Sequence, residues 1–191
     1  LERTIEVAKR SRGFDWKKLP KDLRVGMDSR PLEGAGRVED TYNLLGHAAR
    51  KLLDGAAKLT GQSLERICMA AGIRLLLAPS IKAGLDINWS DPEQKAQAID
   101  RLTREVDALV DWLETKQPSV ATHDTVEPYI KAIQQVEEQD LEKSADGKVH
   151  IRRGVAVDRR VSIEDEEMRH GRKSKSKRYN GYKEHVAADL R

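Results

Sequence analysis

Cysteine, aromatic residues and long apolar runs are all scarce in this sequence. Its 191 residues include a single cysteine, Cys68, so the chain can form neither an internal disulfide nor a metal site built on two cysteines. No stretch approaches the roughly 20 apolar residues that a membrane-spanning helix needs, and residues 1–10 lack the apolar run of a secretory signal. We therefore expect a cytoplasmic protein with no membrane partner.

Aromatic residues make up 4% of the chain, whereas charged residues make up 35%. This balance favours helices with solvated faces over a sandwich of sheets. Apolar residues also recur at helical spacing between residues 40 and 145. The sequence therefore predicts a predominantly helical chain, with helices at residues 41–61, 63–72, 75–85, 90–116 and 126–141.

Strands are expected on either side of this helical stretch. Apolar residues alternate with Arg24 and Gly26 and lead into Asp28, which places the Asp28 carboxylate at the C-terminal end of a first strand. A second substantial strand is predicted from Tyr182 to Leu190. Between the two, further alternation predicts short exposed strands or extended arms at Val149, Ile151, Val155, Val157, Val161 and Ile163.

Positive charge is concentrated near the end of the chain. The net charge is +3, but residues 169–183 carry seven basic and no acidic side chains, which leaves −4 for the remainder. Tyrosines and histidines lie among these cations, a mixture that suits a nucleic-acid backbone with occasional stacking. A solvated mobile loop is the alternative interpretation. The candidate nucleic-acid contacts are Arg169, Arg172, Lys173, Lys175, Lys177, Arg178 and Lys183.

Several familiar site patterns are absent from the sequence. The triplet Gly34-Ala35-Gly36 invites a nucleotide-binding interpretation, but Glu39 occupies the position of the third glycine of a dinucleotide fingerprint. The five histidines lack the spacing of zinc ligands, and no serine lies in a nucleophile elbow. Trp89 and Trp112 are expected to pack in the core or a groove rather than to bind a ligand.

Asp28 is the candidate for chemistry. An aspartate that ends a strand and precedes a glycine-rich loop can reach into a cleft and hold a cation through oxygen. Strand-end aspartates also cap turns, so both interpretations stay open from the spacing alone.

Two longer motifs resemble the DDE transposases of bacterial insertion sequences. One runs from Asp28 to Leu45 (DSRPLEGAGRVEDTYNLL); the other begins at Asp165 (DEEMRHGRKS) and continues from Lys177 to Asp189 (KRYNGYKEHVAAD). The resemblance covers most of the chain from about Leu23 onward.

The resemblance implies an α/β fragment with a partial RNase H-like sheet and a large all-α insertion between strands one and two. The chain then divides into an N-terminal segment with the first catalytic strand (1–39), the helical insertion (40–145), and a basic arm with the second strand (146–191). The chain begins at Leu1 rather than Met and stops after an apolar segment, so we expect a piece of a longer protein.

The resemblance also implies an activity, in which three acidic residues hold two Mg²⁺ or Mn²⁺ ions for DNA strand cleavage and transfer. Asp28 matches the first acid, and the other two are expected beyond Arg191. The implied partners are transposon ends, target DNA and further copies of the protein, in a bacterial cytoplasm and on the nucleoid. This piece alone is expected to be inactive.

Asp189 is a further acidic residue near the expected sheet, but strand geometry argues against it as a second metal ligand. Antiparallel pairing of the two predicted strands puts it about 20 Å from a strand-end Asp28. Two alternatives to the transposase remain open. One is a non-enzymatic DNA-binding or helical interaction module, and the other is an inactive transposase remnant.

Overall fold

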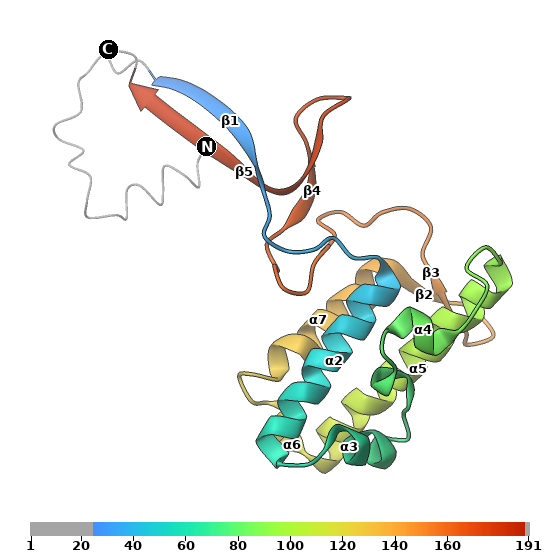
Figure 1. Cartoon of the computed structure of the whole chain (residues 1–191). Helices are drawn as coiled ribbons and strands as arrows, with labels where there is room; N and C mark the ends of the chain where they lie inside the picture. The colour runs from blue at the N-terminus through green and yellow to red at the C-terminus, as the bar shows by residue number, and fades with distance from the viewer. Residues whose placement is uncertain (1–24, 190–191) are drawn as a thin grey trace. The chain divides into compact units, whose positions relative to one another are not determined.

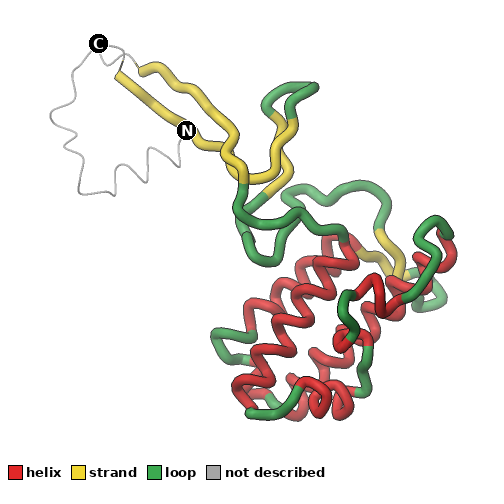
Figure 2. The backbone as a smooth tube through the Cα atoms, in the orientation of Figure 1, coloured by secondary structure: helices red, strands yellow, loops and turns green. Residues whose placement is uncertain are grey.

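The computed structural model describes residues 25–189, about half of which are helical. Most of the expected N-terminal segment, residues 1–24, lies outside the described part. The described residues divide into two compact units, one formed by 25–31 with 183–189 and the other by 32–182. In chain order the elements are β1 (Val25–Glu33), α2 (Thr41–Thr60), α3 (Leu64–Ala71), the 3₁₀ helix η2 (Leu75–Leu77), α4 (Ile81–Leu85), α5 (Pro92–Lys116), α6 (Pro118–Ala121), α7 (Glu127–Asp140), β2 (Leu141–Lys143), β3 (Val149–Ile151), β4 (Arg169–Arg172) and β5 (Arg178–Asp189) (Figures 1 and 2).

Two small antiparallel sheets accompany the helices. One has three strands in the order β1-β5-β4, and the other pairs β2 with β3. The two strands predicted before and after the helical stretch are therefore neighbours in one sheet. This confirms a mixed α/β chain, whereas the RNase H-like character of the sheet and the expected division at residues 39 and 145 stay predictions. None of the helices within residues 25–189 is both long and apolar enough to span a bilayer.

Helix α2 is central to the larger unit and packs on both α7 and α5 (Figure 1). Asp40 caps its first turn by accepting a hydrogen bond from Asn43 N at 3.0 Å. Gly61 ends it with φ 66°, a left-handed conformation that glycine adopts without strain. These signals explain why the helix predicted at 41–61 is confirmed. Its buried apolar face comprises Leu44, Leu45, Ala48, Ala49, Leu52, Leu53 and Ala56.

The long helix α5 lies against α2 with one fully buried apolar row, which includes Leu102, Val106 and Leu109. Trp89, just before α5, meets the ring of Tyr42 edge-on, with centroids 5.1 Å apart and an interplanar angle of 89°. The expectation that Trp89 packs against the core is therefore confirmed.

The sequence predicts one helix at residues 75–85, bent near Pro79, but the chain breaks there completely and forms the two short helices η2 and α4. Pro79 has no backbone N–H and disfavours a helical conformation in the residue before it. Ala78 is accordingly extended, with ψ 155°. The start of η2 is capped instead by the Glu105 carboxylate, which accepts a hydrogen bond from Leu75 N at 2.6 Å.

The segment after β3 forms no strand up to Met168, although the alternation of its apolar residues predicted short exposed strands or extended arms there. A buried ion pair fixes this segment to the end of α7. The Arg159 guanidinium binds both carboxylate oxygens of Asp140, with Nε 2.7 Å from Oδ1, and the Thr41 hydroxyl donates to Oδ2 at 2.8 Å. Asp140 is 7% exposed, so these partners satisfy a carboxylate that has little access to water.

The neighbouring Arg160 also holds this segment to α7, and it does so from a buried position. It is 6% exposed, its backbone N–H donates to Gln139 Oε1 at 2.9 Å, and its Nε donates to the Ser162 carbonyl at 2.9 Å. Val161 and Ile163 are buried beside it, so the prediction of exposed strands is wrong for these two residues.

The glycines of the loop after β1 serve close packing. A Cβ atom on Gly34 would lie 2.8 Å from Met168 Cγ, and one on Gly36 would lie 2.6 Å from Asp165 Cβ. Real Cβ atoms essentially never approach other atoms so closely. The loop therefore packs directly against Met168 and Asp165 at these two glycines.

Two acidic side chains face each other between α5 and α7. Burial, followed by the neighbouring Asp107 carboxylate, raises the pKa of Glu137 to about 7. Burial also raises the pKa of Asp107. One oxygen of Glu137 is buried without a hydrogen-bond partner, which is consistent with a carboxyl group that holds a proton in the folded protein.

The Glu137 carboxyl group should make the helical unit, formed by helices α2 to α7, less stable as the pH rises. Between about pH 4.5 and 7 the folded protein binds a proton on Glu137 that the unfolded chain has released, so the free energy of unfolding falls across this window. We expect Glu137→Gln to remove roughly 1–2 kcal/mol of this dependence. Urea unfolding at a series of pH values measures it. Glu138→Gln, an exposed neighbour on the same helix, should leave the dependence unchanged.

Candidate nucleic-acid interface

Asp28 lies in the middle of β1 rather than at its C-terminal end. The strand continues to Glu33, so the strand-end placement is wrong. Its side chain is exposed, and Oδ1 accepts a hydrogen bond from Ser29 N at 2.7 Å. Pro31 does not end the strand, because β1 is at the edge of its sheet and an edge strand tolerates a residue without an N–H.

The position of Asp28 also bears on the expected distance to Asp189. The predicted separation of about 20 Å assumed that Asp28 ends its strand, whereas β1 continues beyond it to Glu33. Strands β1 and β5 are neighbours in the sheet, and Arg30 Nε binds Glu184 Oε2 across them. The distance itself stays a prediction.

Asp28 does not form a metal site with the residues described. Within 25–189, no three His, Cys, Asp or Glu side chains are grouped so that they could hold a metal ion. A single carboxylate supplies one or two oxygens, whereas Mg²⁺ requires six ligands in octahedral geometry. By themselves, the described residues therefore do not fit the Mg²⁺ or Mn²⁺ pair that the resemblance implies.

The basic segment folds as a β4–β5 hairpin with a loop at residues 173–177. The Lys173 N–H donates to the Lys177 carbonyl at 2.9 Å, and the Lys177 N–H donates to Ser174 Oγ at 3.0 Å. These bonds close the loop and leave Lys173, Lys175 and Lys177 exposed. Three of the predicted cations therefore lie together at the tip.

Two arginines lie directly opposite each other just below this tip. Arg172 pairs with Arg178 in the antiparallel register, so their Cβ atoms are separated by about 5 Å and point to the same face. Both side chains are exposed, and neither forms an ion pair within the described part of the chain. Like charges in this arrangement repel, and an anion bound between them would remove the repulsion.

The rest of the hairpin is ordered by its own side chains. Tyr179 lies opposite Gly171, and its ring covers that glycine so closely that a Cβ there would be 2.6 Å from Tyr179 Cε2. His170 lies opposite Asn180, with Nδ1 2.6 Å from Oδ1. An amide oxygen only accepts hydrogen bonds, so His170 donates from Nδ1.

Not every residue of the basic segment is available to a ligand. Arg169 Nε binds Asp158 Oδ1 at 2.8 Å. The Tyr182 hydroxyl donates to Asp165, and this bond raises the pKa of Tyr182 to about 12 and lowers that of Asp165. Lys183 belongs to the unit formed by 25–31 with 183–189, where it is exposed. The available cations of the hairpin are therefore Arg172, Lys173, Lys175, Lys177 and Arg178.

A groove of about 580 Å³ runs along this hairpin, and Arg172 and Arg178 line it. Val155, which is 76% exposed, and Asn180 also line it. The sequence analysis did not single out either residue as part of a site. Asn180 could have been found from the hairpin register, but Val155 carries no local signal because it comes from a distant loop.

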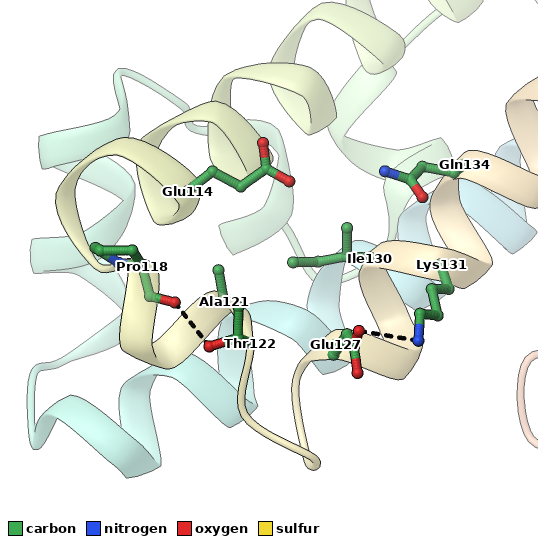
Figure 3. A pocket seen from close by; sticks show the side chains of 8 residues that line it. All are labelled: Glu114, Pro118, Ala121, Thr122, Glu127, Ile130, Lys131 and Gln134. Carbon is green, nitrogen blue, oxygen red and sulfur yellow. Dashed lines mark hydrogen bonds and ion pairs between the residues drawn. The ribbon is translucent and has the colours of Figure 1, made fainter.

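The helical bundle offers a second hollow but no reactive group. A pocket of about 370 Å³ lies between the end of α5, α6 and α7, with Ile130 in its wall and Glu127 bound to Lys131 at 2.9 Å (Figure 3). Cys68 is buried elsewhere in the bundle. Burial, with smaller effects from Glu105 and Glu65, raises the pKa of its thiol to about 11. Such a thiol is a poor nucleophile at neutral pH.

Comparisons with models of known protein families, with curated proteins and with solved structures find no match to this chain.

Proposed function

We propose that this chain is the DNA-binding part of a transposase of the DDE class, and that it contributes the first acidic residue of the active site. The β4–β5 hairpin carries this proposal, because it presents five exposed cations without an acidic partner in the described part of the chain. Lysines at the tip can neutralise successive phosphates, while the paired arginines can bind one phosphate through several N–H donors. Such contacts position DNA without reading its sequence.

The order of elements supports the catalytic half of the proposal. The strand that bears Asp28 neighbours β5, and the helices from Thr41 to Asp140 separate the two strands in the sequence. A helical insertion between two neighbouring strands is what the resemblance implies. In a longer protein, Asp28 would contribute one carboxylate to a two-metal site that activates a water or 3′-hydroxyl and stabilises the leaving oxygen.

Measuring how this chain binds duplex DNA tests the proposed DNA binding. If the five hairpin cations each neutralise one phosphate, the logarithm of the association constant should fall with the logarithm of the salt concentration with a slope of about −4.5. Fluorescence anisotropy with a labelled duplex measures this slope. A chain whose DNA affinity is independent of salt would contradict the proposal. The chain alone should not cleave DNA when Mg²⁺ is added.

A cleavage assay on the protein encoded by the complete reading frame tests the proposed catalytic role. A frame that continues beyond Arg191 with a further Asp and a late Glu would support the enzyme, whereas an early stop would indicate a remnant. Asp28→Asn should abolish Mg²⁺-dependent cleavage of the element's own ends, and Asp158→Asn, on an exposed loop, should preserve it. Full cleavage by the Asp28→Asn protein would overturn the catalytic role.

One observation favours a DNA-binding module without enzymatic activity as the second candidate. Asp28 is exposed on its strand, and the part of the chain that the structure describes brings no second acid into a metal-binding group with it. This candidate predicts the same salt-dependent binding, but the complete frame would then bind DNA without cutting it.

A further inference from the structure

We propose that the phosphate-binding surface continues from the hairpin onto the helical unit, through His170 and Val155 to Arg152. This inference rests on the proposed DNA binding and adds a specific binding site to it. The site takes the phosphodiester backbone of DNA.

Two hollows of the unit formed by 32–182 meet at the same two residues. The groove along the hairpin is lined by Val155 and His170, and so is a smaller hollow of about 230 Å³ beside the end of α7. Arg152 lines this second hollow. The two hollows therefore adjoin at Val155 and His170, and together we call them the trough; the Arg172 and Arg178 pair lines one hollow and Arg152 lines the other.

The trough has a positive charge that its own residues do not neutralise. Asp140 is the acidic residue that lines it, and both of its oxygens are bound to Arg159. Three guanidinium groups remain, those of Arg152, Arg172 and Arg178, and none forms an ion pair among the described residues. A polyanion is the ligand that matches this distribution.

Arg152 is held in place before any ligand arrives. Its backbone N–H donates to the Asp140 carbonyl at 2.7 Å, and one guanidinium nitrogen donates to the Leu141 carbonyl at 3.2 Å. The remaining guanidinium donors carry no hydrogen bond in the structure, and the side chain is exposed. A pre-positioned arginine loses little conformational entropy when it binds a phosphate.

His170 joins the two parts of the trough. Its ring is oriented by the hydrogen bond from Nδ1 to Asn180 Oδ1, so Nε2 is left for other contacts. A planar guanidinium fork matches two phosphate oxygens, and a regular row of phosphates can reach the separated guanidinium groups of Arg152, Arg172 and Arg178 in turn. DNA backbone is therefore favoured over an acidic protein.

The salt dependence of DNA binding by single variants tests this site. Arg152→Ala should reduce the magnitude of the slope by about 0.9, the contribution of one phosphate contact. Arg152→Lys keeps the charge and should retain most of the slope, which separates loss of a contact from loss of structure. Arg104→Ala is the matched control, since it removes an exposed arginine of α5 that is bound to Asp100, and it should leave the slope unchanged.

The outcomes separate this site from the proposed function. If the triple variant Lys173→Ala, Lys175→Ala, Lys177→Ala reduces the slope while Arg152→Ala does not, the hairpin binds DNA and the trough is rejected. If neither variant changes the slope, both proposals fail. If polyglutamate displaces the labelled duplex at lower concentration than unlabelled DNA does, the surface binds an acidic protein, and the trough as a DNA site is overturned.

Discussion

Replacing Gly181 with alanine is expected to break the pairing of β5 with β1. Gly181 has φ 151°, a backbone conformation that side chains with a Cβ rarely adopt. Its Cβ would also lie less than 3.0 Å from Leu32 O, Gly34 N and Glu33 C. These are backbone atoms, which cannot rotate away as a side chain can. We expect a cost of about 3 kcal/mol or more to the local structure.

Hydrogen exchange measures this loss where it occurs. Amide protection should disappear along β1, β4 and β5, while α2, α5 and α7 stay protected because their core is separate from the sheet. Gly171→Ala is the matched control in the same hairpin. Its Cβ would displace the Tyr179 ring rather than backbone, so it should cost less. If the strands of the Gly181→Ala protein are as well protected as those of the unaltered protein, Gly181 is not needed for the pairing of β5 with β1.

Much of the helical unit was predictable, because its signals are local. The apolar period of α2 begins after Asp40 and ends at Gly61, and the same two residues cap the helix in the structure. The structure of the segment that follows β3 was not predictable from the spacing of its apolar residues. Its valines alternate as in a strand, but its partners lie on α7 instead of on a neighbouring strand: Arg159 donates to Asp140, and the Gln139 side chain donates to the Arg160 carbonyl.

The candidate site was predictable in composition but not in geometry. The run of basic residues at 169–183 is visible in the sequence. Which of these residues are available to a ligand depends on contacts with residues that are distant in the sequence. Arg169 is bound by Asp158, and the pairing of Arg172 with Arg178 requires the hairpin register. The position of Asp28 was missed because Pro31 reads as a strand end, although an edge strand accepts it.

Removing the carboxylate of Asp140 should destabilise the helical unit by about 3–5 kcal/mol. The Arg159 side chain is 14% exposed, so Asp140→Ala leaves a largely buried guanidinium without its counter-charge. The Thr41 hydroxyl, at the start of α2, also loses its acceptor. Urea unfolding followed by circular dichroism at 222 nm, the standard helix band, measures the change. The surface ion pair of Asp158 with Arg169 is the control: Asp158→Asn removes the charge, suits the left-handed backbone at this position (φ 60°), and should cost at most about 1 kcal/mol.

A double-mutant cycle separates the ion pair from the space it fills. If the penalty of Asp140→Ala comes from the unpaired charge, Arg159→Met should rescue part of it in the double variant, since the buried charge is then gone. If it comes from lost packing, the two changes should add. A loss of about 1 kcal/mol or less for Asp140→Ala would show that this pair does not hold the segment after β3 to α7.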